Sequence, residues 1–166
     1  MSKAVEKFKL AGFFTLEHIR DGKVIHSERF DNLVMDEGIN SALNVVFHAA
    51  TQITTWYVGL FEGNYTPVGT ESGSTWHTTC TECTAYDESA RPEYVEAASS
   101  AKSITNSASK AVFTMNATKT VYGAFLCGLS TKGGDATPLF AAARFGSSRS
   151  VVATDILQIS YTVNGA

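Results

Sequence analysis

The sequence comes nearest to metal-binding chemistry where a histidine precedes two cysteines at three-residue intervals. His77, Cys80 and Cys83 could offer an imidazole and two thiolates to a zinc ion. A structural zinc site needs four ligands, and the sequence has no second Cys-x-x-Cys or His-x-x-His pair. Two other interpretations remain open, a reversible Cys80–Cys83 disulfide or two free thiols in or beside a loop. Because three cysteines do not make a disulfide framework, we expect free thiols and no metal.

Four carboxylate residues flank an arginine in the segment 87–96, and paired carboxylates can carry out acid–base catalysis. They belong to Asp87, Glu88, Glu93 and Glu96. A glycosidase holds two carboxylates across a sugar-sized cleft, whereas these lie beside Arg91 and Pro92 on what we interpret as a solvated edge. We therefore predict a local ion-pair cluster and count Arg91 among the candidate contact residues.

Sequence motifs give no other support for catalysis. The chain has no nucleophile elbow, no phosphate-binding loop and no glycine motif for a dinucleotide. We expect no catalytic residue, no cofactor and no enzymatic activity.

Most aromatic residues lie in apolar stretches beside Val, Leu and Ile, which favours a place in the core. A platform for bases or sugars would need them exposed beside polar groups. Trp76 and Tyr65 differ, because they lie in the polar segment 62–81, which we predict to be a long loop. An exposed Trp is a good interface anchor, so we expect Trp76 and Tyr65 to contact a partner.

The elements that position these residues begin with a hairpin. Apolar runs at 8–20 and 24–30 flank Asp21-Gly22, and such a pair between two strands is a strong hairpin signal. Before it, residues 1–7 lack an apolar run and a cleavage site, so we expect no signal peptide. We predict a flexible contact arm there, which carries Lys3 and Lys7.

One amphipathic helix is predicted over about 36–49. Asp36 can cap its first turn, and Glu37 is favoured near the positive helix end. An apolar stripe follows at i, i+4, i+7 and i+8, formed by Ile39, Leu43, Val46 and Phe47. We expect this stripe to be buried against a sheet, so that the helix is a packing element rather than a site.

The remaining chain is predicted to form short strands with turns between them. The expected strands are 53–61, 84–88, 93–97, 111–117, 121–129, 139–145 and 156–163, with turns at 132–135 and 146–150. The last strand alternates cleanly between apolar and polar residues. This pattern predicts a single mostly β domain over 1–166, an antiparallel β-sandwich or jelly-roll-like fold with one helix.

The composition gives no support for nucleic-acid binding or for a membrane span. The 166 residues are 44% hydrophobic and 17% charged, below the globular average of about 25% charged. A net charge of −3 gives no reason to expect nucleic-acid binding, and no apolar run is long enough to span a membrane. A low-charge surface suits a protein that is partly covered by neighbours.

Short segments follow one another in a distinctive order over about residues 30–163. They are NLV at 32–34, DEGIN at 36–40, WYVGLF at 56–61, YDE at 86–88, RP at 91–92, YGAFL at 122–126, LFAAARF at 139–145 and DILQISYTV at 155–163. This order resembles a group of small structural proteins of tailed bacteriophages. His77 and the two cysteines near it are not part of the pattern, and the resemblance implies no catalytic residues.

The resemblance implies a virion structural role, either as a capsid cement (decoration) protein or as a tail, collar or baseplate component. We expect a cement protein that bridges and stabilises capsomers. Its partners would be the major capsid protein and copies of itself, in the virion and, during assembly, in the host cytoplasm. A third interpretation, a carbohydrate-binding module for host attachment, depends on Trp76.

Overall fold

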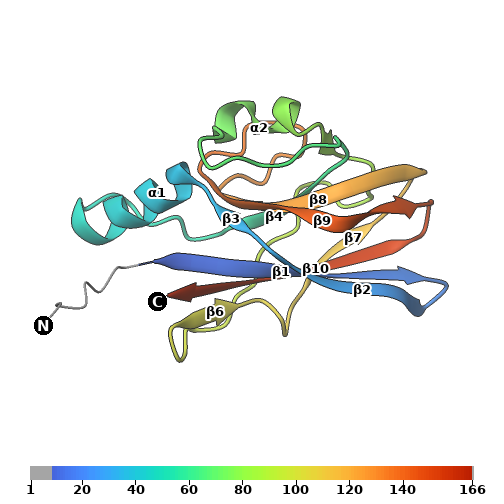
Figure 1. The fold of residues 1–166 in the computed structure, drawn as a ribbon, viewed down its shortest axis with the longest axis horizontal. Coiled ribbons are helices and arrows are strands. Elements are labelled where there is room, and N and C mark those ends of the chain that lie inside the picture. The colour runs from blue at the N-terminus through green and yellow to red at the C-terminus, as the bar shows by residue number, and fades with distance from the viewer. Residues whose placement is uncertain (1–8, 166) are drawn as a thin grey trace, which may run out of the picture.

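The computed structural model describes residues 9–165, which form two antiparallel β-sheets packed face to face (Figure 1). The predicted mostly β, sandwich-like class is confirmed. The described residues contain two helices, however, rather than one. The predicted arm at 1–7, with Lys3 and Lys7, lies outside the described residues.

The first sheet, sheet A, is built around the two ends of the described chain. Its strands run in the order β2-β1-β10-β6, and β7 also pairs with β10. The bounds are β1 Leu10–Arg20, β2 Lys23–Asp31, β6 Ser103–Thr105, β7 Ala111–Thr114 and β10 Ile156–Gly165. β1 and β10 pair along almost their whole length, from Leu10↔Gly165 to Ile19↔Ile156.

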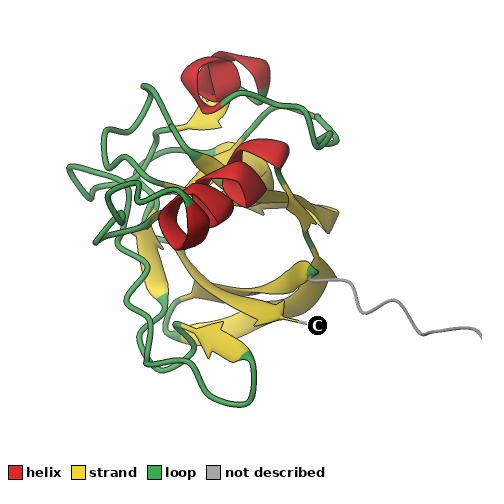
Figure 2. Cartoon of the chain, turned by 90° about the vertical axis from the view of Figure 1, so that its left-hand side faces the viewer, coloured by secondary structure: helices red, strands yellow, loops and turns green. Residues whose placement is uncertain are grey.

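The second sheet, sheet B, has the order β3-β9-β8-β4-β5. The bounds are β3 Leu33–Val34, β4 Tyr57–Phe61, β5 Glu82–Cys83, β8 Lys119–Cys127 and β9 Leu139–Val151. The helices are α1, Asp36–Phe47, and α2, Gly73–Thr79. In the end-on view of Figure 2, α1 crosses the near end of the sandwich. Helix α2 lies over sheet B (Figure 1).

The predicted first hairpin is confirmed. β1 and β2 pair antiparallel, and the turn residues Asp21 and Gly22 have φ of 50° and 72°. Both angles are left-handed, as a two-residue hairpin turn of the favoured twist requires, and Asp and Gly tolerate them best.

The core between the sheets is rich in aromatic residues. The rings of Phe14 and Tyr161 stack at 4.3 Å between centroids, and Phe30 meets Phe145 edge to face at 4.9 Å. In β10 the residues Leu157, Ile159 and Tyr161 are buried, as the predicted alternation requires. Burial of this apolar surface is the main source of stability.

A third layer covers the outer face of sheet B, and segment 62–81 is not simply a loop. It contains α2, whose Trp76 is fully buried among Phe61, Tyr65 and Phe125, with ring centroids 5.9, 6.0 and 5.9 Å away. Sheet B is therefore packed on both faces, against sheet A and against this layer.

Several predicted strand bounds were wrong. β9 continues to Val151 through the predicted turn at 146–150, because residues 149–151 pair with 119–121 of β8 and this pairing outweighs local turn preference. The strand predicted at 53–61 begins only at Tyr57. The strands predicted at 84–88 and 93–97 are reduced to isolated bridges, Tyr86↔Met115 and Tyr57↔Glu93.

Candidate interaction surface

Helix α1 is attached to the sandwich mainly through its first turn. Met35 is buried and donates its backbone N–H to the Phe140 carbonyl at 2.9 Å. Gly38 is the buried residue of the helix, and a Cβ there would lie 2.5 Å from the Phe140 oxygen. Only glycine allows so close an approach of two backbones.

The predicted Asp36 cap is wrong. Met35 occupies the N-cap position without a side-chain hydrogen bond, and the Asp36 N–H donates to the Gly69 carbonyl at 2.9 Å. Glu37 instead ties three elements together, since its Oε2 accepts the N–H of Gly73 at 2.9 Å and that of Leu139 at 2.7 Å. Sequence reasoning missed this role, because both partners are distant in sequence.

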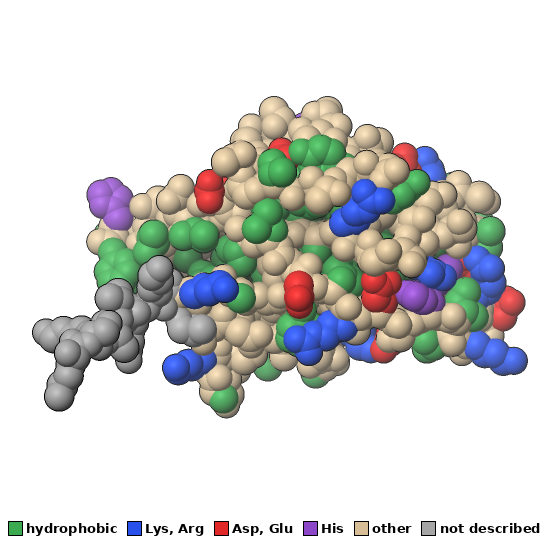
Figure 3. Space-filling model, in the orientation of Figure 1, with side chains coloured by type: hydrophobic (Ala, Val, Ile, Leu, Met, Phe, Trp, Pro, Cys, Tyr) green, Lys and Arg blue, Asp and Glu red, His purple; other side chains and the backbone are tan. Residues whose placement is uncertain are grey.

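The apolar stripe of α1 points away from the core, which overturns the prediction that it is buried. Ile39 and Leu43 are 36% and 39% exposed, and Val46 and Phe47 are 68% and 80% exposed. Figure 3 shows hydrophobic side chains gathered at this end of the molecule.

The helix packs through a second face, which has the same period but small side chains. Gly38, Ser41, Ala42 and Val45 are at i, i+3, i+4 and i+7, and all four are at least partly buried. Below them Trp56 and Phe140 meet edge to face at 5.4 Å. A hollow of about 230 Å³ remains between this face of α1 and the two rings. The small face is turned inward because Gly38 is where the helix backbone contacts the Phe140 backbone.

A hollow adjoins the exposed stripe at the N-terminal end of α1. Its volume is about 410 Å³, and it lies between the start of β1, the strand β3 and Ile39. Its lining is largely apolar and comprises Lys9, Leu10, Ala11, Asn32, Leu33, Val34 and Ile39. Leu33 itself is 42% exposed. We call Leu33, Ile39, Leu43, Val46 and Phe47 the α1 surface.

The three possible zinc ligands, His77, Cys80 and Cys83, do not form a group that could hold a metal ion. Cys80 lies in the outer cluster and Cys83 in the core between the sheets, and both are buried and free. Burial raises the pKa of the Cys83 thiol to about 11, which keeps it protonated, whereas zinc binds the thiolate. Within residues 9–165 no group of three or more His, Cys, Asp or Glu side chains is arranged to hold a metal ion.

Arg91 is not a surface contact residue, contrary to expectation. It is 2% exposed and makes two hydrogen bonds to Glu82, at 2.8 and 2.7 Å. Its other N–H groups donate to the carbonyls of Leu129, Gly134 and Asp135, each at 2.8 Å. Arg91 therefore fixes the loop before β9 to the segment that follows α2.

The predicted ion-pair cluster of Arg91 with the four carboxylates near it in sequence is wrong, because Arg91 pairs with Glu82 instead. Glu88 accepts the backbone N–H of Thr114 at 3.1 Å, and Asp87, Glu93 and Glu96 are not buried. This arrangement offers no pair of carboxylates across a cleft.

Trp76 and Tyr65 are likewise not exposed anchors. Trp76 has no exposed surface, while Tyr65 is half-buried against it and hydrogen-bonded through its hydroxyl to Glu71. A signal was present, since Trp76 and Cys80 are four residues apart and so share one face of a helix. The carbohydrate-binding interpretation loses the residue on which it depended.

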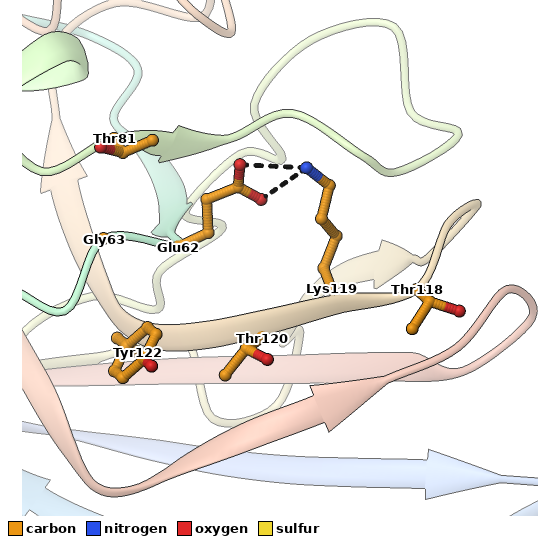
Figure 4. Close-up of a pocket in the computed structure, with 7 residues that line it drawn as sticks. All are labelled: Glu62, Gly63, Thr81, Thr118, Lys119, Thr120 and Tyr122. Carbon is orange, nitrogen blue, oxygen red and sulfur yellow. Dashed lines mark hydrogen bonds and ion pairs between the residues drawn. The ribbon is translucent and has the colours of Figure 1, made fainter.

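Beside the edge of sheet B lies a shallow polar depression of about 470 Å³ (Figure 4). The Lys119 Nζ contacts both Glu62 carboxylate oxygens, at 3.0 and 2.9 Å, which neutralises the charges there. The other lining residues are Gly63, Thr81, Thr118, Thr120 and Tyr122. Its described lining residues offer hydroxyl groups to water or a polar molecule, but no free charge.

A buried histidine–aspartate pair was also missed from the sequence. The Nε2 of His18 lies 2.8 Å from Asp155, whose carboxylate also takes two hydrogen bonds from Arg20, at 2.8 and 2.7 Å. These hydrogen bonds hold the pKa of Asp155 well below its usual range. The pair joins β1 to the turn before β10, and no Ser, Thr or Cys hydroxyl or thiol among the described residues is hydrogen-bonded to His18.

The sequence matches no protein-family model, and no curated protein is significantly similar to it. Neither of the described helices is long and apolar enough to cross a membrane.

Proposed function

We propose that this protein is a non-enzymatic structural component of a tailed-bacteriophage particle, and that it acts as a capsid cement protein. In this proposal the α1 surface makes the contacts with neighbouring subunits. The observation that carries the contact role is the exposure of Val46 and Phe47, at 68% and 80%, on a helix otherwise free of charge after Glu37.

Two arguments support a contact surface here. Clusters of exposed apolar residues of this kind mark interaction sites in soluble proteins, whereas scattered ones do not. The conspicuous polar groups also have structural partners, since Arg91 pairs with Glu82 and Asp155 with Arg20. The placement in a virion rests on the resemblance described above.

A cement protein would stabilise a shell by bridging neighbouring subunits, so that several small interfaces must break together. Such multivalent binding makes the later contacts intramolecular and raises the effective affinity. Because the α1 surface is apolar, attachment through it should depend only weakly on salt.

The test uses phage particles that lack the protein. We expect them to assemble but to burst at lower temperature, and added wild-type protein to restore them. Phe47→Glu should fail to restore them. The control Val24→Glu alters a side chain of β2 that is 57% exposed, and it should restore them.

Two outcomes would overturn the cement proposal. Particles without the protein that withstand heat but do not adsorb to cells would favour host attachment. A few copies per virion, rather than many, would favour a tail, collar or baseplate position.

A further inference from the structure

The α1 surface has a projecting side chain at one end and a hollow at the other. Phe47, in the last turn of α1, is 80% exposed. The hollow of about 410 Å³ lies beside Ile39, in the first turns, and is walled by Leu10, Leu33 and Val34. Ile39 belongs to both features, so they lie on one continuous face.

The spacing along this face is regular. Ile39, Leu43 and Phe47 are at i, i+4 and i+8 and form one ridge of the helix. At a rise of about 1.5 Å per residue, Leu43 lies midway between the other two, about 6 Å from each along the axis. A twofold axis at Leu43 would therefore place Phe47 of each copy opposite Ile39 of the other.

We infer that two copies of this chain pair through α1, with the helices antiparallel about a twofold axis at Leu43 and each Phe47 seated in the hollow beside the other copy's Ile39. This inference deepens the proposed function, because it names one partner of the α1 surface. A twofold contact must be self-complementary, and a projection and a hollow at equal distances from one point meet that requirement.

The charges of α1 favour this orientation over a parallel one. Its acidic residues, Asp36 and Glu37, lie in the first turn, and its last turn has no basic residue. A parallel pair would bring the acidic ends and the like ends of the helix dipoles together. In the antiparallel pair each acidic end lies beside the C-terminal end of the other helix, and the ridge between them has no charge to desolvate.

A second copy also fits better than a charged partner. The α1 surface has no formal charge, and among the described residues that line the hollow Lys9 alone is charged. The contact is small, so the pair should be weak and should dissociate on dilution. Weak pairing suits a subunit that assembles only where its local concentration is high.

Disulfide trapping tests the axis directly. The native cysteines at 80, 83 and 127 are buried, so a thiol introduced on α1 would be the exposed one among the described residues. Leu43→Cys should form a disulfide-linked dimer under mild oxidation. Asn44→Cys, also exposed but turned about 100° around the helix, is the matched control and should link at least about tenfold more slowly.

Ile39→Cys separates the two orientations. In the antiparallel pair its two copies lie about 12 Å apart along the helix axis, beyond the separation of about 7 Å that a disulfide can span. It should therefore not link, whereas in a parallel pair it would link as fast as Leu43→Cys.

Sedimentation of the purified full chain gives the second measurement. Wild type and Val24→Glu should show a reversible, concentration-dependent dimer, and Phe47→Glu should weaken it by more than about tenfold. At concentrations low enough to keep all three proteins monomeric, their thermal unfolding should be the same, because both substituted side chains are exposed.

A wild-type chain that stays monomeric at millimolar concentration, or Leu43→Cys that links no faster than Asn44→Cys, overturns the inference. Fast linking of Ile39→Cys overturns the antiparallel arrangement. These outcomes are distinct from failure of the proposed function, which is tested on particles. A monomeric protein that still restores particle stability through Phe47 would refute self-pairing alone.

Discussion

Removal of the Arg91 side chain should cost far more stability than removal of any surface charge. Arg91 makes two hydrogen bonds to Glu82 and one to each of three backbone carbonyls, and it is 2% exposed. Arg91→Ala would leave the Glu82 carboxylate buried with the N–H of Gly133, at 3.0 Å, as its remaining donor. Breaking a buried ion pair in this way costs about 3–5 kcal/mol.

A double-mutant cycle separates the ion pair from the rest of the site. Arg91→Met with Glu82→Leu removes both charges and keeps apolar volume, so it should cost less than the two single changes added together. Urea unfolding of the four proteins of this cycle, and of Arg91→Ala, measures the free energies. An Arg91→Ala loss below about 1 kcal/mol, or strictly additive effects, would refute the argument that Arg91 and Glu82 act as one buried unit.

Three further changes test separate parts of the structure. Trp76→Ala should cost about 3–5 kcal/mol in urea unfolding, because a fully buried ring is lost from the layer over sheet B; an effect below about 1 kcal/mol would mean that the ring is exposed. Phe47→Ala should change the unfolding free energy by no more than about 0.5 kcal/mol, since Phe47 is 80% exposed. A loss of several kcal/mol would mean that Phe47 is buried in the core. The pKa of Asp155 is lowered by Arg20, so its stabilisation is complete above the unfolded pKa of about 4 and is lost as the pH falls below it. On acidification from about pH 6 to about pH 3, wild type should therefore lose more unfolding free energy than Asp155→Asn. Equal losses would contradict this role of the Asp155 carboxylate.

The hairpin and the final strand were predictable because their signals are local. The Asp21-Gly22 pair favours a two-residue turn because both residues tolerate a left-handed φ. The alternation of β10 shows which of its side chains face the core. Strand β9 was harder, because the residues after Phe145 are typical of a turn and become strand only through pairing with β8. That information lies in the partner strand and not in the segment itself.

The residues of the apolar α1 stripe could be identified from the sequence, but they were predicted to be buried and are exposed. Helix α1 has two stripes of the same period, and hydrophobicity selects the one with large residues as the core face. The structure turns the stripe of Gly38, Ser41, Ala42 and Val45 inward, because Gly38 is where the helix backbone contacts the Phe140 backbone. No period within the helix reveals where another element's backbone will contact it.

The layer that contains α2 limits which positions of sheet B can tolerate substitution. Sheet B has no solvated face along the stretch of β8 from Gly123 to Cys127, where five consecutive residues are buried. Substitutions there have no outward direction in which to place a larger or polar side chain, while much of the outer face of β2 can accept them. Amide hydrogens of β8 should exchange last and those of β2 early. Variation among natural forms of this protein should therefore collect on sheet A, and neighbours can reach the sandwich at its ends and on that side, but not through the middle of sheet B.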